Sequence, residues 1–183
     1  MQASASADAS ADLRHPDTTV RQPLYNAEQR RRRDETPWTL VQGVLAPVQF
    51  LACLVSIVLV SRFLATGGGE TAATVSIIVK TFLLYSIMVT GCLWEKAVYD
   101  RYLFAGPFFW EDVVSMGVIA LHTAYLAALA FDGMSVRGRM YLALAAYALY
   151  VVNATQFLLK LRAARLSRGD AVRGGPALAG AME

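Results

Sequence analysis

Four long stretches of the chain contain almost only apolar residues, and short polar segments separate them. The stretches are residues 40–64, 72–94, 108–131 and 140–159. Each has the roughly 20 residues that a helix needs to cross the hydrocarbon core of a bilayer. A segment that spans lipid must be a helix or part of a closed β-barrel, because lipid offers no hydrogen-bond partners. None of the four alternates as barrel strands do, so the pattern predicts an all-α membrane protein with four transmembrane helices in an antiparallel bundle.

Residues that favour helix ends lie between these stretches. Thr36 and Pro37 supply an N-cap and a first-turn proline before the first stretch. Gly106 and Pro107 lie in a similar place before the third stretch, and three glycines at residues 67–69 separate the first two.

Lysine and arginine are distributed unevenly between the two sides of this predicted bundle. Of the 17, 13 lie in the N-terminal tail, in the loop after the second stretch and in the C-terminal segment. Three lie on the opposite side, and Lys80 lies within the second stretch. Because cytoplasmic segments carry the excess of positive charge, both termini are predicted to be cytoplasmic.

The parts that flank the four stretches differ from them in composition. The first 24 residues are rich in Ala, Ser and Asp, lack the apolar segment of a signal peptide and are predicted to be disordered. Asn26 and Gln29 have the spacing of a capping box, which predicts a short polar helix over residues 26–34. We therefore divide the chain into a polar, largely disordered cytoplasmic tail with an Arg-rich run (1–35), a four-helix membrane domain (36–166) and a flexible cytoplasmic tail (167–183).

The composition agrees with a small membrane protein and excludes several other classes. Of the 183 residues, 56% are hydrophobic and 17% charged, whereas a soluble domain has about a quarter charged residues. Two cysteines and two histidines cannot build a disulfide framework or a multi-histidine metal site. Apart from Arg62 and Lys80, the basic residues avoid the apolar stretches, and they form no face for nucleic acid.

Polar residues within the apolar stretches are costly in lipid and mostly face the bundle interior, so each is a candidate site residue. Glu111 and His122 lie 11 residues apart, close to three helical turns, and share one face of the third stretch. His122 and Lys80 form a small second layer at greater depth. A larger cluster near the cytoplasmic side draws on all four stretches: Gln42 and Gln49, Glu95 and Lys96, Glu111 and Asp112, Asn153 and Gln156.

Each candidate also has a purely structural explanation. Acids are favourable at a helix N-terminus, buried amides join helices, and a lysine within a span can extend to the interface. The aromatic residues around Trp110 form either an interfacial belt or a docking surface for a flat apolar ligand. The first of these explanations applies to Glu111 and Asp112, the second to Asn153 and Gln156, and the third to Lys80. Packing within the bundle would explain His122, and a solvated pair at the interface would explain Glu95 and Lys96.

Five strings carry a resemblance to a known family. They are WTLVQGVLAPVQF (residues 38–50), GCLWEK (91–96), FFWEDVVSM (108–116), LHTAYL (121–126) and NATQFLLKL (153–161). In these strings the chain resembles the 3-vinyl bacteriochlorophyllide hydratases of anoxygenic phototrophs. The resemblance extends over about residues 25–166.

The resemblance implies a hydro-lyase of bacteriochlorophyll synthesis. Such an enzyme adds water across the C3-vinyl group of a chlorophyllide and gives a 1-hydroxyethyl group. The resemblance also implies a Mg-tetrapyrrole substrate, no redox cofactor, no metal of the protein's own, and a place in the bacterial inner, photosynthetic membrane. It provides no established catalytic residue to transfer to this chain.

Alkene hydration needs a proton on the terminal carbon and water on the inner carbon, which a neutral buried carboxylic acid can initiate. Because Glu111 lies beside Asp112 and on the face of His122, we predict Glu111 as the acid and Asp112 as the residue that tunes it. Glu95, with Asn153 and Gln156, is predicted to position or deprotonate the water. The predicted substrate-binding residues are His122, Asn153, Gln156, Gln49, Trp110 and Lys96.

His122 is also a candidate ligand of the substrate magnesium. Its separation from Glu111 is about 16 Å along the helix. That separation exceeds the distance between the metal of a tetrapyrrole and its vinyl group, so Glu111 cannot be the acid if His122 holds the metal.

Other function classes fit the sequence less well. A four-helix exporter places an acid in its first helix, and the first stretch here has none. A haem carrier would use two intramembrane histidines, and His122 is alone in the four stretches. A non-catalytic pigment-binding or assembly protein stays open as an alternative. So do a homodimer and an association with other enzymes of pigment synthesis, because four helices offer little room for so large a substrate.

Overall fold

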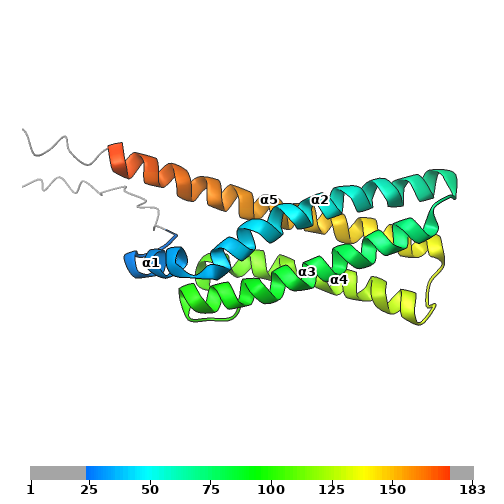
Figure 1. Ribbon diagram of the computed structural model, residues 1–183, viewed down its shortest axis with the longest axis horizontal. Helices are drawn as coiled ribbons and strands as arrows, with labels where there is room; N and C mark the ends of the chain where they lie inside the picture. Colours follow the sequence, from blue (N-terminus) through cyan, green and yellow to red (C-terminus); the bar gives the residue numbers. More distant parts are fainter. Residues whose placement is uncertain (1–23, 174–183) are drawn as a thin grey trace, which may run out of the picture.

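The computed structural model describes residues 24–173, with side chains to residue 166, and every element in that part is helical. The elements are α1 (Ala27–Glu35), α2 (Pro37–Thr66), α3 (Glu70–Tyr99), the 3-10 turn η1 (Gly106–Phe108), α4 (Phe109–Ala130) and α5 (Val136–Arg173) (Figure 1). Four helices are long and apolar enough to span a membrane, which confirms the predicted all-α membrane protein. The predicted disordered tail and the last ten residues lie outside the described part.

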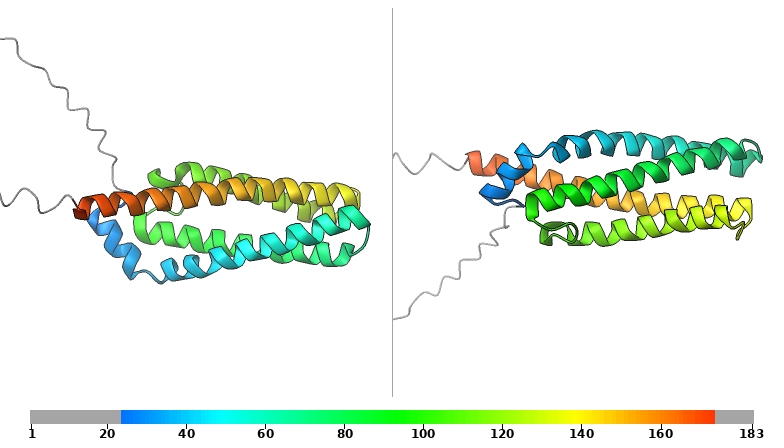
Figure 2. Two further views of the ribbon diagram at one scale, coloured as in Figure 1. Left: turned by 90° about the horizontal axis from the view of Figure 1, so that it is seen from above. Right: turned by 60° about the horizontal axis from the view of Figure 1, so that its bottom comes forward.

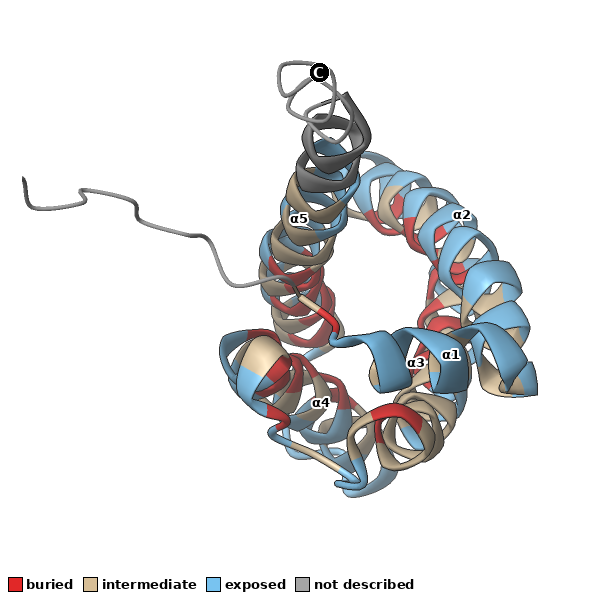
Figure 3. Cartoon of the chain, turned by 90° about the vertical axis from the view of Figure 1, so that its left-hand side faces the viewer, coloured by how far each residue is buried: buried red, intermediate tan, exposed pale blue. Residues whose placement is uncertain are grey.

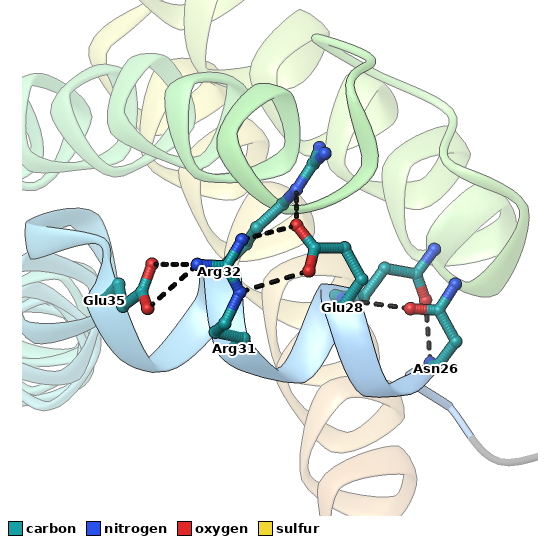
Figure 4. A network of polar contacts seen from close by, with 6 residues as sticks. Asn26, Glu28, Arg31, Arg32 and Glu35 are labelled. Carbon is teal, nitrogen blue, oxygen red and sulfur yellow. Dashed lines mark hydrogen bonds and ion pairs between the residues drawn. The ribbon is translucent and has the colours of Figure 1, made fainter.

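The short polar helix predicted over residues 26–34 is present as α1. The Asn26 side chain accepts the Gln29 backbone N–H at 2.8 Å, and the Gln29 side chain accepts the Asn26 N–H at 3.0 Å (Figure 4). Arg31 and Arg32 form ion pairs with Glu28 at 2.9 and 3.0 Å. Their hydrogen bonds lower the pKa of Glu28 to about 2, so this network stays charged at neutral pH. The capping box was therefore predicted correctly from two residues.

The ends of the long helices follow most of the sequence signals. Pro37 occupies the first turn of α2, and Gly67 ends that helix in the left-handed region with φ of 73°. Thr36 is the N-cap of α2, but its side chain makes no capping hydrogen bond. Gly106 and Pro107 open η1 rather than α4, which begins at Phe109.

The four long helices form two closely packed pairs. Helix α2 packs along α3 and helix α4 along α5, whereas the pairs contact each other less extensively (Figures 1 and 2). Figure 3 shows that the buried residues lie on the faces that the helices turn inward. We call the region of buried side chains between the two pairs the seam. A hydrogen bond between Ser56 and Tyr147 crosses it at 2.6 Å, and a more exposed one between Tyr85 and Thr123 joins the two pairs at 2.7 Å.

Polar and apolar residues occupy different ends of the bundle interior. Val60, Phe63 and Met140 are buried close to the turns at residues 67–69 and 131–135. Glu95, Glu111 and Asp112 are buried at the other end, close to the loop of residues 100–105. Large apolar side chains on the outer faces are exposed, as in a protein surrounded by lipid. The fold thus brings carboxyl groups into the seam at one end only.

Candidate active site

Two carboxyl groups meet across the seam. Glu95 on α3 and Asp112 on α4 are only 6% and 4% exposed, and their side chains are in hydrogen-bond contact. The loop between α3 and η1 holds both: the Phe104 N–H donates to Asp112 Oδ2 at 2.7 Å, and the Ala105 N–H donates to Glu95 Oε2 at 3.2 Å. Phe104 has φ of 58°, a left-handed conformation uncommon outside glycine. The backbone of this loop therefore fixes the position of the pair.

The contact between these two groups constrains their chemistry. An ionised carboxylate only accepts hydrogen bonds, so two carboxyl groups bond to each other only when one carries a proton. Two ionised carboxylates within hydrogen-bond contact would repel each other in a region with little water. The geometry suits a pair that shares one proton and can donate it.

Glu111, one position before Asp112, has a different partner. Its Oε1 lies 2.6 Å from the Lys160 ammonium, and Lys160 also donates to the Pro107 carbonyl oxygen. The ammonium lies 5.0 Å from the centre of the Phe108 ring. A carboxylate in such an ion pair accepts hydrogen bonds and has no proton to donate. Glu111 and the Glu95–Asp112 pair therefore differ in their partners: one carboxyl group faces a cation, and the other two face each other.

Three of the predicted amide residues carry side-chain oxygens that are buried in the bundle. The Asn153 Nδ2 donates to the Ser115 hydroxyl at 2.8 Å, which joins α5 to α4. The side-chain oxygens of Asn153, Gln156 and Gln49 are buried and have no hydrogen-bond partner among the described residues. Such oxygens can accept a hydrogen bond from water or ligate a magnesium ion in a substrate. Gln42, by contrast, donates to Thr90 at 2.7 Å and serves to join α2 to α3.

The deeper layer contains His122 and Lys80. His122 Nδ1 lies 2.8 Å from the Val118 carbonyl oxygen, and its Nε2 has no partner in the described part of the chain. Its ring centre lies 5.7 Å from that of Tyr147. Lys80 is fully buried and turns inward, so the alternative in which it extends to the interface is wrong. Sequence reasoning did not include Lys80 among the binding residues, although its isolated charge in an apolar stretch was a signal.

Two predicted binding residues lie away from these groups. Trp110 is 69% exposed on the outer face of α4, because two positions along a helix from Asp112 correspond to a rotation of about 200°. Lys96 forms an ion pair with Asp100 at 2.5 Å. Neither side chain is brought to the carboxyl pair.

Aromatic rings close the seam at the end near the carboxyl pair. Their centres are 5.7 to 6.0 Å apart in a continuous chain of contacts. The rings come from the segment before α1 and from α3, η1 and α5: Tyr25, Trp94, Tyr99, Phe108 and Phe157. Tyr25 and Phe157 were not predicted, since nothing in their sequence context shows that they meet.

Comparisons with known proteins agree on one family. A model of the family described as 2-vinyl bacteriochlorophyllide hydratase matches residues 25–163. The chain is 65% identical to the 2-vinyl bacteriochlorophyllide hydratase of Rhodobacter capsulatus over 151 residues, which are 82% of this chain and 88% of that protein. It is 66% identical to the protein of the same name from Cereibacter sphaeroides over 143 residues, 78% of this chain and 89% of that protein. No solved structure matches.

The ion pair of Glu111 and Lys160 generates a prediction about stability. Lys160→Met leaves a buried carboxylate unpaired, so we expect it to lower the free energy of unfolding by about 3 kcal/mol. Lys160→Met combined with Glu111→Gln should recover most of that loss, because no uncompensated charge remains. Thermal unfolding of the purified protein in detergent measures both, with the exposed Arg162→Met as the matched control. If Lys160→Met were no more destabilising than Arg162→Met, the ion pair would not hold α5 to α4.

Proposed function

Because the chain belongs to the 2-vinyl bacteriochlorophyllide hydratase family, we propose that it hydrates the C3-vinyl group of a chlorophyllide, position 2 in the older ring numbering. The product carries a 1-hydroxyethyl group. The protein is a carbon–oxygen lyase of bacteriochlorophyll synthesis, and its substrate is a Mg-tetrapyrrole. The hydrogen-bonded carboxyl pair of Glu95 and Asp112 is the observation that supports a specific mechanism.

The carboxyl pair begins the reaction by donating its proton. The proton goes to the terminal carbon of the vinyl group, whose π electrons form the new C–H bond. The positive charge that develops on the inner carbon is delocalised into the conjugated macrocycle. A water molecule attacks that carbon, and its released proton returns to the carboxylate pair. The pair is therefore regenerated, and no redox cofactor is consumed.

The neighbouring groups position the reactants. The free side-chain oxygens of Gln49, Asn153 and Gln156 accept hydrogen bonds from the attacking water or contact the substrate magnesium. Glu111, ion-paired with Lys160, keeps a fixed charge beside the site and does not transfer a proton. His122 lies ten residues from Asp112, about 15 Å along α4. It therefore contacts the far edge of the macrocycle rather than its metal, and Trp110 lies on the lipid-facing surface.

The protein lies in the bacterial inner membrane as four antiparallel spans with both termini in the cytoplasm. The distribution of Lys and Arg supports this orientation, because the Arg-rich α1 and the loop of residues 100–105 lie at the same end of the bundle (Figure 1). The carboxyl pair then lies near the cytoplasmic side. The size of the substrate still favours a homodimer or an association with other enzymes of pigment synthesis.

Carboxylate variants test the mechanism. We expect Asp112→Asn and Glu95→Gln each to lower the hydration rate by about 100-fold or more, because each removes the shared proton. Glu111→Gln should have a much smaller effect. Membranes that contain each variant are supplied with vinyl chlorophyllide, and the product is measured as a mass increase of one water.

The controls separate loss of chemistry from loss of protein. Each variant is compared at equal expression, and the exposed Glu70→Gln at the other end of α3 is the matched control. Full activity in both pair variants would exclude the pair as the acid, and loss of activity in Glu111→Gln alone would return the role to Glu111. Pigment binding without hydration in the unmodified protein would favour the non-catalytic alternative.

Two glycines test the orientation. Gly106, the first residue of η1, and Gly133, in the turn before α5, are exposed at opposite ends of the bundle, and each has open space for a side chain. In a chain that carries Cys53→Ala and Cys92→Ala, a membrane-impermeant thiol reagent added to intact cells with a permeabilised outer membrane should label Gly133→Cys. It should label Gly106→Cys only after the inner membrane is opened. The reverse pattern would invert the proposed topology.

A further inference from the structure

Lys80 is the one lysine of the described part whose side chain is completely buried. It projects from α3 into the seam, and its ammonium lies 4.0 Å from the centre of the Tyr150 ring on α5. The face of the ring attracts an ammonium in this position but satisfies none of its N–H donors. Within residues 24–166 Lys80 Nζ has neither a hydrogen-bond partner nor a carboxylate at ion-pair distance.

The surroundings of Lys80 supply no negative charge. Its neighbours are the free thiol of Cys53, the Tyr150 ring and His122, whose Nε2 is also without a partner among the described residues. An isolated ammonium in the apolar interior is costly, and such residues in membrane proteins mark sites for substrates and ions. The unpartnered ammonium suits an anion or a carboxylate from outside the chain. His122 donates its Nδ1–H to the Val118 carbonyl oxygen, so the Nε2 of the neutral ring can accept a hydrogen bond but has none to donate to an anion.

The register of the helices gives the distance from this layer to the carboxyl pair. The Asn153–Ser115 hydrogen bond sets α5 against α4, and the His122–Tyr147 contact shows that numbering rises in one helix as it falls in the other. From the level of this hydrogen bond, Asp112 lies three residues closer to the loop of residues 100–105, and Tyr150 lies three residues farther from that loop. The six steps place Tyr150 about 9 Å from Asp112 along the bundle, whereas Lys80 lies 15 residues from Glu95 on α3, about 22 Å along that helix. The Lys80 side chain spans part of that distance to reach the Tyr150 ring, so its ammonium lies between these two levels.

A chlorophyllide carries groups that match both layers. Its C3-vinyl group and its propionate side chain are carried by neighbouring pyrrole rings and project in different directions, and the propionate is a free carboxylate because no alcohol is esterified to it. With the vinyl group at Glu95 and Asp112, the propionate on the neighbouring ring extends along the seam toward Tyr150. We propose that Lys80 binds the propionate carboxylate of the substrate. This inference rests on the proposed function and adds that the enzyme selects free acids over their esters.

The test pairs two substrates with variants of one residue. Vinyl chlorophyllide and its propionate methyl ester are supplied to the purified protein, and kcat/KM and the equilibrium dissociation constant are measured for each. The unmodified protein should favour the free acid by about tenfold or more, the size expected for a charged hydrogen bond. Lys80→Met should lose that preference through a lower kcat/KM and weaker binding for the free acid, and Lys80→Arg should keep it. The matched control is Arg62→Met, which removes one cation from an exposed position.

Each outcome decides between the alternatives. If the unmodified protein has the same kcat/KM and dissociation constant for the acid and the ester, the proposal is overturned without any variant. Lys80 would then be a packing residue. A preference that persists in Lys80→Met would also overturn it. A folding defect in Lys80→Met is detected by thermal unfolding, and the comparison then uses Lys80→Arg and the unmodified protein. Absence of hydration of both substrates by the unmodified protein would instead remove the proposed function, and this inference with it.

Discussion

The contact between the carboxyl groups of Glu95 and Asp112 is the interaction on which the proposed chemistry depends. It requires that α3 and α4, which belong to different helix pairs, approach each other near one end of the bundle. It also requires the loop of residues 100–105, whose backbone donates one N–H to each carboxyl group. Because the outer surface faces lipid, water does not compete freely for either group, and a shared proton replaces the solvation that two ions would need.

Adjacent positions on one helix receive different electrostatic roles from their partners. Glu111 and Asp112 point about 100° apart, so Glu111 meets Lys160 on α5 and Asp112 meets Glu95 on α3. One carboxylate is thus compensated by a cation, and the other is in contact with a second acid. The same seam continues to Lys80, whose charge has no counterpart in the described chain. A polar seam within an apolar bundle therefore presents a carboxyl pair near one end and a buried cation deeper in the bundle, an arrangement that suits one asymmetric substrate.

The sequence predicted more of the fold than of the site. Long apolar stretches, the capping box at Asn26 and the glycines after Thr66 are local signals, so the helices and some of their ends followed directly. Helices α3 and α5 extend beyond the apolar stretches, to Tyr99 and Arg173. The grouping of polar residues near one end also followed, because helical rise converts residue number into depth. The rotation of each helix about its axis is set by packing between helices. Sequence alone therefore could not assign Lys160 to Glu111, turn Trp110 outward or bury Lys80.

Infrared spectroscopy of the resting protein tests the shared proton directly. At neutral pH the unmodified protein should show the C=O stretch of a protonated carboxyl group, shifted by deuterium exchange. The band should disappear in both Glu95→Gln and Asp112→Asn and persist in Glu111→Gln. If the unmodified protein lacks this band, or if the band survives in both pair variants, the two acids do not share a proton and the mechanism fails.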